Sequence, residues 1–322
     1  MAIVSTVRGP IDTADLGRVL MHEHIFILSP EMMQNYDTGW HEEERVQDAV
    51  DKLRALKKAG IDTLVDQTAV GYGRYIPRLE RIAREVDVHI LVPTGLIDFH
   101  DIPHYFAYGR APRAGGQDML VDIFASEIEQ GIGGGPVKAS FIKVATERHG
   151  INPGLERILR AAAKAHRRTG APISTHTDGK RGGVAQQDLF EEEGVDLSRV
   201  IIGHCGDNTD LDYLRGIMDR GSFAGMDRFG LYPMFPPSDE TRAEVVAKLC
   251  AEGYADRMLL SHDANCYIDW NPDTPLMAPN SHFRFIPEVV VPLLRQYGVT
   301  QRQLDTMFVE NPRRIFETTG AY

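Results

Sequence analysis

The feature that most constrains the fold of this chain is an alternation of short apolar runs with amphipathic helical segments. Eight runs are rich in Val, Ile and Leu and have the length of buried parallel strands: 19–26, 61–68, 88–95, 137–145, 171–177, 199–205, 222–229 and 257–264. Between them, apolar residues recur at helical spacing, as Val46, Val50, Leu53 and Leu56 do in 43–59. Several helical segments end in a glycine, a residue typical of helix C-termini, at Gly60, Gly170 and Gly221.

Eight such strand-and-helix units predict a single α/β domain, a (β/α)8 TIM barrel over residues 1–322. The alternative is an open, doubly wound sheet. That fold usually carries a glycine-rich phosphate loop after its first strand, and this sequence has none there. Residues 264–285 show no periodicity, so we expect a long loop after the eighth strand that covers a substrate at the C-terminal end of the barrel.

The charge and the apolar content limit the kinds of partner. Lys and Arg number 35 and Asp and Glu 46, which gives a net charge of −11 and makes a nucleic-acid partner unfavourable. No run approaches the roughly 20 apolar residues of a membrane span. The three cysteines form no paired spacing and the N-terminal segment lacks a signal-peptide pattern, so we expect a cytoplasmic protein that acts on a small molecule.

Polar residues interrupt the apolar runs near their ends. His22 and His24 lie two apart on a predicted strand, so both face one side while the residue between them faces away. His176, His204 and Asp263 end three later strands, and in a barrel these ends converge on one mouth. Four imidazoles and a carboxylate are the ligands of zinc or a similar divalent ion. Taken one at a time, each of them is better explained as a structural residue, but five of them at matching strand ends favour a metal site.

Lys143 lies within the fourth predicted strand, among residues that should be buried. A buried ammonium costs several kcal/mol unless it is paired or neutralised. One interpretation is a lysine that reaches the barrel mouth or pairs with a carboxylate. The other is a lysine carboxylated by CO2, which turns it into an anion that bridges two metals.

The segments HEHIF, SFIKVAT, ISTHT, IIGHCGD, GMDRFG and LLSHDA resemble the phosphotriesterase family of the amidohydrolase superfamily, and most closely its phosphotriesterase-like lactonases. The resemblance extends from RGPIDTADLG to VENPRRIFE. It implies two divalent ions, of zinc, cobalt, iron or manganese, and a homodimer. It also implies their ligands: His22, His24, carboxylated Lys143 and Asp263 for one ion, and Lys143, His176 and His204 for the other.

The resemblance further implies a lactonase with promiscuous phosphotriesterase activity. Two metals lower the pKa of a bridging water, so that hydroxide is the nucleophile and Asp263 takes up its proton. Arg228 would point into the pocket; the alternative for it is an ion pair with Asp227. Cys266 is expected in the pocket wall, and Trp270 either at the pocket entrance or in a dimer contact.

Two positions depart from the pattern of the lactonases. Ile97 and Phe99 stand where tyrosines are common, and the apolar stretch from there to Tyr105 and Phe106 suggests a pocket for acyl chains. The missing hydroxyls indicate a weaker or redirected preference for acyl-homoserine lactones. The alternatives are hydrolysis of another ester, an amide or a phosphate at the same site, and a metal-binding protein without catalysis.

Overall fold

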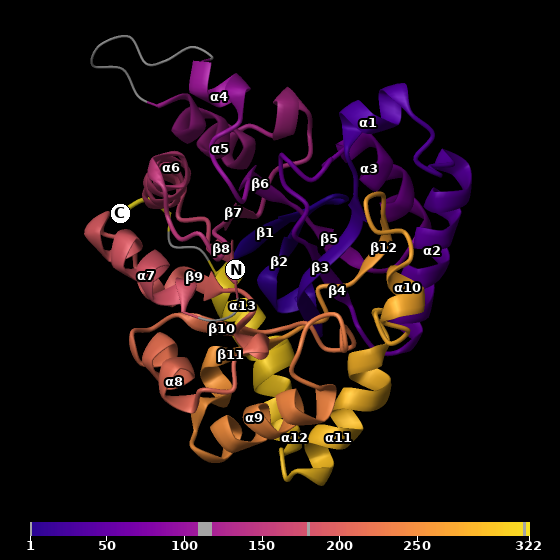
Figure 1. The fold of residues 1–322 in the computed structure, drawn as a ribbon, viewed down its shortest axis with the longest axis vertical. Helices are drawn as coiled ribbons and strands as arrows, with labels where there is room; N and C mark the ends of the chain where they lie inside the picture. The colour runs from indigo at the N-terminus through magenta and orange to yellow at the C-terminus, as the bar shows by residue number, and fades with distance from the viewer. Residues whose placement is uncertain (1, 109–117, 179–180, 318–319) are drawn as a thin grey trace.

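The computed structural model of the protein describes residues 2–108, 118–178, 181–317 and 320–322. Within them, parallel strands form an inner barrel and most helices lie outside it (Figure 1). An antiparallel hairpin of β1 (Ile3–Thr6) and β2 (Gly9–Asp12) precedes the barrel. The barrel strands are β3 (Val19–Ile27), β4 (Thr63–Asp66), β5 (His89–Leu91), β6 (Pro93–Leu96), β7 (Phe141–Ala145), β8 (Ile173–His176), β9 (Val200–Ile202), β10 (Phe223–Met226), β11 (Met258–Leu260) and β12 (Asn265–Ile268).

Each of the eight apolar runs contains a strand, and the third contains two, because β5 and β6 are separated by Val92 alone. The strands pair in parallel in the orders β12-β3-β4-β5 and β6-β7-β8-β9-β10-β11. The barrel closes where the chain leaves β11: the Asp263 amide donates to the His22 carbonyl (2.9 Å), and the His24 amide donates to the Ala264 carbonyl (2.8 Å). The predicted (β/α)8 barrel is therefore confirmed.

Helices cover the outside of the barrel, and Gly60, Gly170 and Gly221 follow three helical segments with φ of 87°, 75° and 106°, as expected. The α-helices are α1 (Pro30–Asn35), α2 (Glu42–Lys58), α3 (Ile76–Glu85), α4 (His104–Tyr108), α5 (Met119–Glu129), α6 (Pro153–Thr169), α7 (Gly182–Glu192), α8 (Leu211–Asp219), α9 (Asp239–Ala251), α10 (Thr274–Met277), α11 (Val291–Gln296), α12 (Gln301–Asp305) and α13 (Asn311–Phe316). Short 3-10 turns are η1 (Thr13–Leu16), η2 (Ile132–Gly134), η3 (Leu197–Arg199), η4 (Cys205–Asp207) and η5 (Tyr254–Arg257), and η6 (Ile286–Val290) and η7 (Thr306–Glu310) are π-helical. No described helix is long and apolar enough to cross a membrane.

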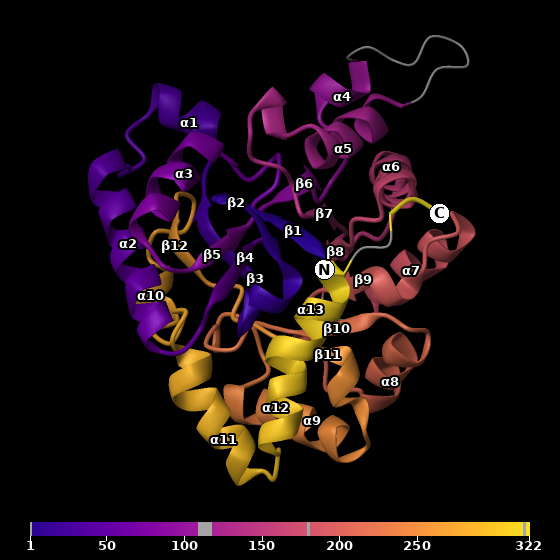
Figure 2. The same ribbon diagram turned by 180° about the vertical axis from the view of Figure 1, so that it is seen from behind.

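The inside of the barrel changes from apolar to polar along the strands. At the N-terminal end, buried side chains from seven strands meet those of the hairpin and α13, which cover that end in Figure 2: Val4, Val19, Val65, Leu91, Phe141, Ile201, Phe223, Leu259 and Phe316. Two residues beyond Phe141 on β7 lies Lys143, and four beyond Leu259 lies Asp263. The apolar layers close one end, and the polar side chains gather at the other.

The segment after β11 differs from the expected loop. Asn265–Ile268 form β12, which pairs with His24–Ile27 of β3, and α10 follows. The reason is the length of β3, whose nine residues extend beyond the end of β11 and leave an edge for β12 to pair with. The irregular segment is thus anchored to the barrel at its beginning.

Candidate metal centre

Strained backbone marks the C-terminal end of the barrel. In the described part of the chain, the non-glycine residues with positive φ are His204 (60°), Arg228 (66°) and Asp263 (56°). They follow β9, β10 and β11, respectively. Such conformations cost about 1–3 kcal/mol each and persist where the surroundings enforce them, which is typical of functional sites.

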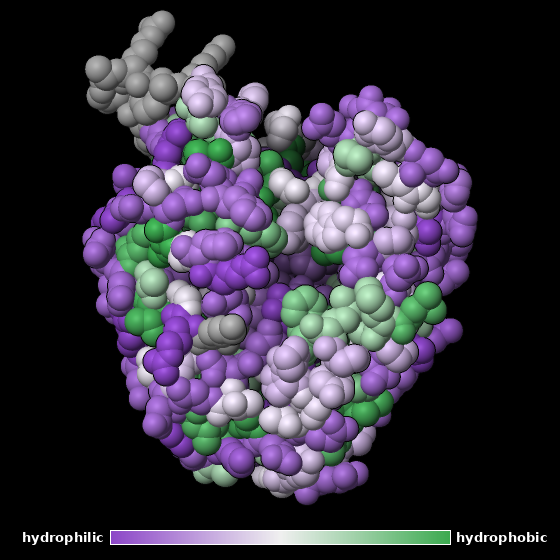
Figure 3. All heavy atoms as spheres, viewed as in Figure 1, coloured by the Kyte–Doolittle hydropathy of each residue, from purple (hydrophilic) through white to green (hydrophobic). Residues whose placement is uncertain are grey.

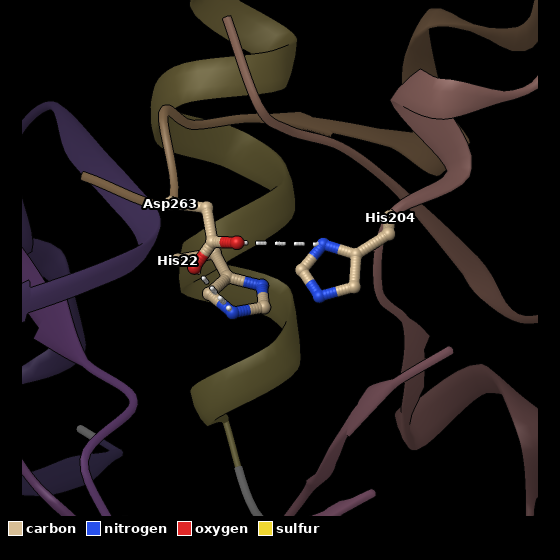
Figure 4. Close-up of side chains that lie close together, drawn as sticks. All are labelled: His22, His204 and Asp263. Carbon is tan, nitrogen blue, oxygen red and sulfur yellow. Dashed lines mark ion pairs between the residues drawn. The ribbon is translucent and has the colours of Figure 1, made fainter. Parts of the chain in front are cut away.

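A first group of ligand atoms converges on Asp263. Its Oδ1 lies 3.5 Å from Nε2 of His22 and 3.4 Å from Nε2 of His24. Figure 4 shows His22, His204 and Asp263 directed toward one another, and a ligand atom from each lies within 4.8 Å of the others. Both β3 histidines are buried and face the same side, as their spacing predicts.

A second pair of ligand atoms lies beside the first group. Nδ1 of His176, at the end of β8, is 2.7 Å from Nε2 of His204. His204 is fully buried, and burial lowers the pKa values of both rings, to about 4 for His176. Neutral imidazole is the form that binds a metal.

The nitrogens that point away from these clusters are held by oxygen atoms. The carboxylate of the buried Asp227 lies 3.1 Å from Nδ1 of His22 and 2.9 Å from Nδ1 of His204. It also accepts a hydrogen bond from the His204 backbone amide. It therefore orients one histidine from each group. Such partners fix the tautomer of a ligating histidine and its direction.

The other two histidines have partners of their own. Nδ1 of His24 lies 2.9 Å from the Thr68 hydroxyl, and Nε2 of His176 lies 3.4 Å from the Glu147 carboxylate. The hydrogen bond to His176 lowers the pKa of Glu147 to about 2, so this group is an anion at neutral pH. All four rings thus have one nitrogen held and the other turned toward the centre.

Lys143 lies beside the first group and has no ion-pair partner among the described residues. Its side chain is 1% exposed, and its Nζ lies 3.2 Å from Nε2 of His22 and 3.3 Å from the Thr175 carbonyl oxygen. No described carboxylate forms an ion pair with it, and burial lowers its pKa to about 7. A substantial fraction of this amine is therefore neutral at physiological pH.

A chain of ion pairs leads outward from Asp263. Its Oδ2 accepts from Nε of Arg228 at 3.1 Å, and Arg228 also pairs with Asp207 at 2.6 Å. Asp207 in turn pairs with the fully buried Arg242, whose guanidinium donates to the carbonyls of Phe235 and Pro237. Burial alone would raise the pKa of Asp263, but the histidine rings and Arg228 outweigh it and hold that pKa well below its usual range.

A cavity of about 270 Å³ opens above the centre. Its floor includes His22, His24, Lys143, His176 and Asp263, and its walls are largely apolar and aromatic: Tyr72, Ile97, Phe99, Leu231, Met234, Phe235, Ile268 and Trp270. Figure 3, seen from the same direction as Figure 1, shows this face hollowed near its middle. A reactive floor below an apolar wall is the usual form of a small-molecule site.

The structure brings together most of the residues singled out from the sequence. The six proposed ligands lie on the floor or directly beside it, and Ile97, Phe99, Arg228 and Trp270 line the cavity. Arg228 pairs with Asp263 and Asp207, whereas its alternative partner Asp227 is engaged by the two histidines. Trp270 is 53% exposed at the cavity.

Two expectations about the pocket wall need correction. Cys266 lies on β12, where alternation turns Asn265 toward the cavity and Cys266 toward a separate hollow against α2. The described lining residues also do not include Tyr105 and Phe106, which lie on α4. The wall is instead completed by residues that sequence reasoning missed, among them Tyr72 and Met234.

The donor set fits two divalent cations. Each histidine is held at one nitrogen and presents the other to the centre, and Asp263 offers Oδ1 beside the β3 pair. The buried Lys143 amine has no ion-pair partner among the described residues and lies 3.2 Å from Nε2 of His22, within reach of a ligand bound there. Nitrogen and carboxylate donors accept zinc, cobalt, iron or manganese.

Comparisons with known proteins agree with this geometry. A family model described as the phosphotriesterase family matches residues 2–316. A phosphotriesterase homology protein of Mycobacterium tuberculosis is 51% identical over 327 aligned positions, which cover 100% of both chains. The solved structure of the phosphotriesterase from Mycobacterium tuberculosis superposes with a TM-score of 0.95 at 50% identity, covering 99% of this chain and 100% of that one. A second solved structure, described as molecular engineering of organophosphate hydrolysis activity from a weak promiscuous lactonase template, has a TM-score of 0.89 at 31% identity and covers 98% of this chain and 100% of its own.

Proposed function

Because the chain belongs to the phosphotriesterase family, we propose that it is a binuclear-metal hydrolase that opens lactone rings and hydrolyses phosphotriesters as a slower side reaction. The single observation that carries the proposal is the double set of ligand atoms around Lys143 on the floor of an apolar cavity. The likeness to a structure described as a promiscuous lactonase template supports the choice of substrate.

The Lys143 amine is proposed to react with CO2 to give a carbamate. The neutral amine attacks the carbon of CO2, an N–C bond forms, and the amine loses a proton to solvent. The product is an anion with two oxygens, one for each ligand group. A pKa near 7 favours this step, because an ammonium is not a nucleophile.

The chemistry that two divalent cations supply when bound is polarisation of the substrate oxygen and acidification of a water molecule. The chain's own residues then act on that reaction. Asp263, with Oδ1 toward the β3 histidines and Oδ2 on Arg228, accepts the proton of the attacking water. Water adds to the lactone carbonyl, the ring C–O bond breaks, and the released alkoxide takes up a proton to give a hydroxy acid.

The cavity walls are proposed to bind the apolar part of the substrate. Phe99 packs on His176 with the ring centroids 4.8 Å apart, and the Arg228 guanidinium lies 4.3 Å from the centroid of the Phe235 ring. Arg228, paired with two carboxylates, positions Asp263. We further propose a cytoplasmic homodimer, in line with the family resemblance and with three free, buried cysteines.

The proposal is tested with protein stripped of metal and reloaded with cobalt or zinc. Lactones of different ring size and chain length, a chromogenic phosphotriester, an aryl ester and an N-acyl amide are assayed side by side. Lactone turnover at least tenfold above the other substrates supports the proposal. If the amide or the aryl ester is the preferred substrate, the protein is a hydrolase of that substrate and not a lactonase. Absence of metal-dependent turnover of every substrate would contradict the proposal that the protein is a hydrolase.

A further inference from the structure

Glu23 is a buried carboxylate that has no part in the proposed reaction. It lies on β3 between the two histidines of the first ligand group, and strand alternation turns its side chain away from theirs. The side chain is fully buried, and among the described residues no lysine or arginine forms an ion pair with it. A carboxylate in such a place must be held by hydrogen-bond donors.

The turn after β11 supplies these donors. Oε1 of Glu23 accepts from the backbone amide of His262 at 2.9 Å, and Nδ1 of the same histidine lies 2.7 Å from it. Oε2 accepts from the Ala264 amide at 3.0 Å. The amide between these two, that of Asp263, donates to the carbonyl of His22 at 2.9 Å. Three successive amides of the turn are therefore bound by two neighbouring residues of β3.

The contacts of the His262 ring determine its tautomer. Its Nε2 lies 2.9 Å from the backbone nitrogen of Ile286, and because a backbone amide donates, Nε2 is the acceptor. The proton of the neutral ring is then on Nδ1, which donates to Glu23. The carboxylate thus receives three hydrogen bonds from N–H groups, and the ionised form, which only accepts, satisfies all three.

These hydrogen bonds bear on the conformation of Asp263. Its φ of 56° lies in the left-handed region, which is unfavourable for a residue with a β-carbon. Turns that contain a left-handed residue direct neighbouring amides at one anion, and here that anion is the carboxylate of Glu23. The side chain of Asp263 is thereby left free to point toward the β3 histidines, as Figure 4 shows for His22.

We propose that Glu23 is a positioning residue, which holds Asp263 in place by binding the amides on both sides of it. The inference rests on the proposed function, in which Asp263 is a metal ligand and the acceptor of a proton. No described contact joins Glu23 to His176 or His204, so its effect is confined to the first ligand group. The residue between two ligating histidines thus fixes a third ligand that lies about 240 positions later in the chain.

The test replaces the carboxylate by an amide of the same shape. In Glu23→Gln the side-chain oxygen still accepts, but the NH2 group faces an N–H donor of the turn whichever way the amide is turned. The matched control is Glu127→Gln, on a buried carboxylate of α5 that pairs with Arg74. Both variants should be less stable than the wild type, and only Glu23→Gln should alter the metal centre.

Cobalt binding to the metal-stripped proteins is measured at a temperature at which all of them are folded. In Glu23→Gln we expect one of the two cobalt ions to bind about tenfold or more weakly and the visible absorption of bound cobalt to change, because partners that orient a ligand control metal affinity by such factors. The control should bind cobalt as the wild type does. Unchanged affinity and absorption in Glu23→Gln would overturn the inference, and so would an equal loss in the control.

Steady-state kinetics at saturating cobalt separate positioning from folding. Glu23→Gln should lower kcat for a lactone about tenfold and change KM less than twofold, because the proton acceptor acts in the transition state. An unchanged kcat would also overturn the inference. If the wild type turns over no lactone, the proposed function alone is contradicted, since the cobalt affinities still decide the role of Glu23.

Two substitutions of His262 give the answer if Glu23→Gln does not fold. His262→Asn places an amide NH2 where Nδ1 lies and still donates to Glu23, whereas the longer side chain of His262→Gln places its amide where Nε2 lies and serves Ile286 alone. We expect His262→Asn to bind cobalt more tightly than His262→Gln. The reverse order, or equal affinities, would overturn the inference.

Discussion

The buried lysine predicts an unusual dependence of stability on pH in the metal-free protein. Burial displaces the pKa of Lys143 from 10.5 to about 7, which corresponds to about 5 kcal/mol against the charged form. Between these two values the unfolded chain binds more protons than the folded one, so stability rises as the pH increases through this window. Below about pH 7 the folded protein carries the whole cost of the buried ammonium.

Replacing the lysine by an apolar side chain of similar length removes this cost. Metal-free Lys143→Met is therefore expected to be more stable than the metal-free wild type by about 4–5 kcal/mol near pH 6.5 and by only about 1 kcal/mol near pH 9.5. The assay is urea unfolding of both proteins after chelation, at the two pH values. Comparing the proteins at each pH cancels the titration of the groups that do not interact with Lys143.

Lys164→Met is the matched control, because Lys164 is an exposed lysine of α6. This variant should stay within about 0.5 kcal/mol of the wild type at both pH values. If the difference in the free energy of unfolding between Lys143→Met and the wild type is the same at both pH values, the reasoning is refuted, because burial would then not hold the lysine neutral. A less stable Lys143→Met at the lower pH would refute it as well.

Four further substitutions, at three residues, test the metal centre. Asp227→Asn, which weakens the shared hold on His22 and His204, should lower metal affinity about 10–100-fold in competition with a chromophoric chelator; unchanged affinity would contradict its orienting role. Asp263→Asn should reduce kcat by at least about 100-fold with a smaller effect on thermal stability, because it removes a proton acceptor at the barrel mouth; near-normal rates across the pH range would exclude that role. Lys143→Ala should lose metal and activity, with partial recovery of both in a short carboxylic acid, and Lys143→Arg should bind no metal pair; full activity of Lys143→Arg would exclude a carbamate.

Much of the fold could be predicted because its signal is local. Buried parallel strands are continuous apolar runs, and each of the eight runs contains a strand. The candidate ligands could be predicted for a related reason: strand alternation and the convergence of strand ends place His22, His24 and Asp263 together without knowledge of the loops.

The residues that were missed depend on long-range contacts. Asp227 precedes Arg228 in the sequence and suggests an ion pair with it, but the positive φ of Arg228 turns that side chain to Asp207 and leaves Asp227 to the histidines. Tyr72 lies in a loop without periodicity, and its place depends on Gly71 against Ile97. A glycine on both sides of this tyrosine is the one local signal of a tight approach.

The error at Cys266 has a different origin. Its side chain orientation follows from the alternation of β12, and that strand forms because β3 extends far enough to pair with Asn265–Ile268. Nothing in the composition of this segment distinguishes a strand from a loop, because the pairing edge is supplied by residues more than 230 positions earlier in the chain. Sequence patterns alone therefore could not orient it.

The central claim is that two metal ions share a carboxylated Lys143, and a crystal structure of the active, cobalt- or zinc-loaded enzyme tests it most directly. We expect two anomalous-scattering peaks, one beside His22, His24 and Asp263 and the other beside His176 and His204, with density for a carboxylate on the Lys143 amine between them. A single peak in fully active protein, or an unmodified amine at Lys143, would contradict it.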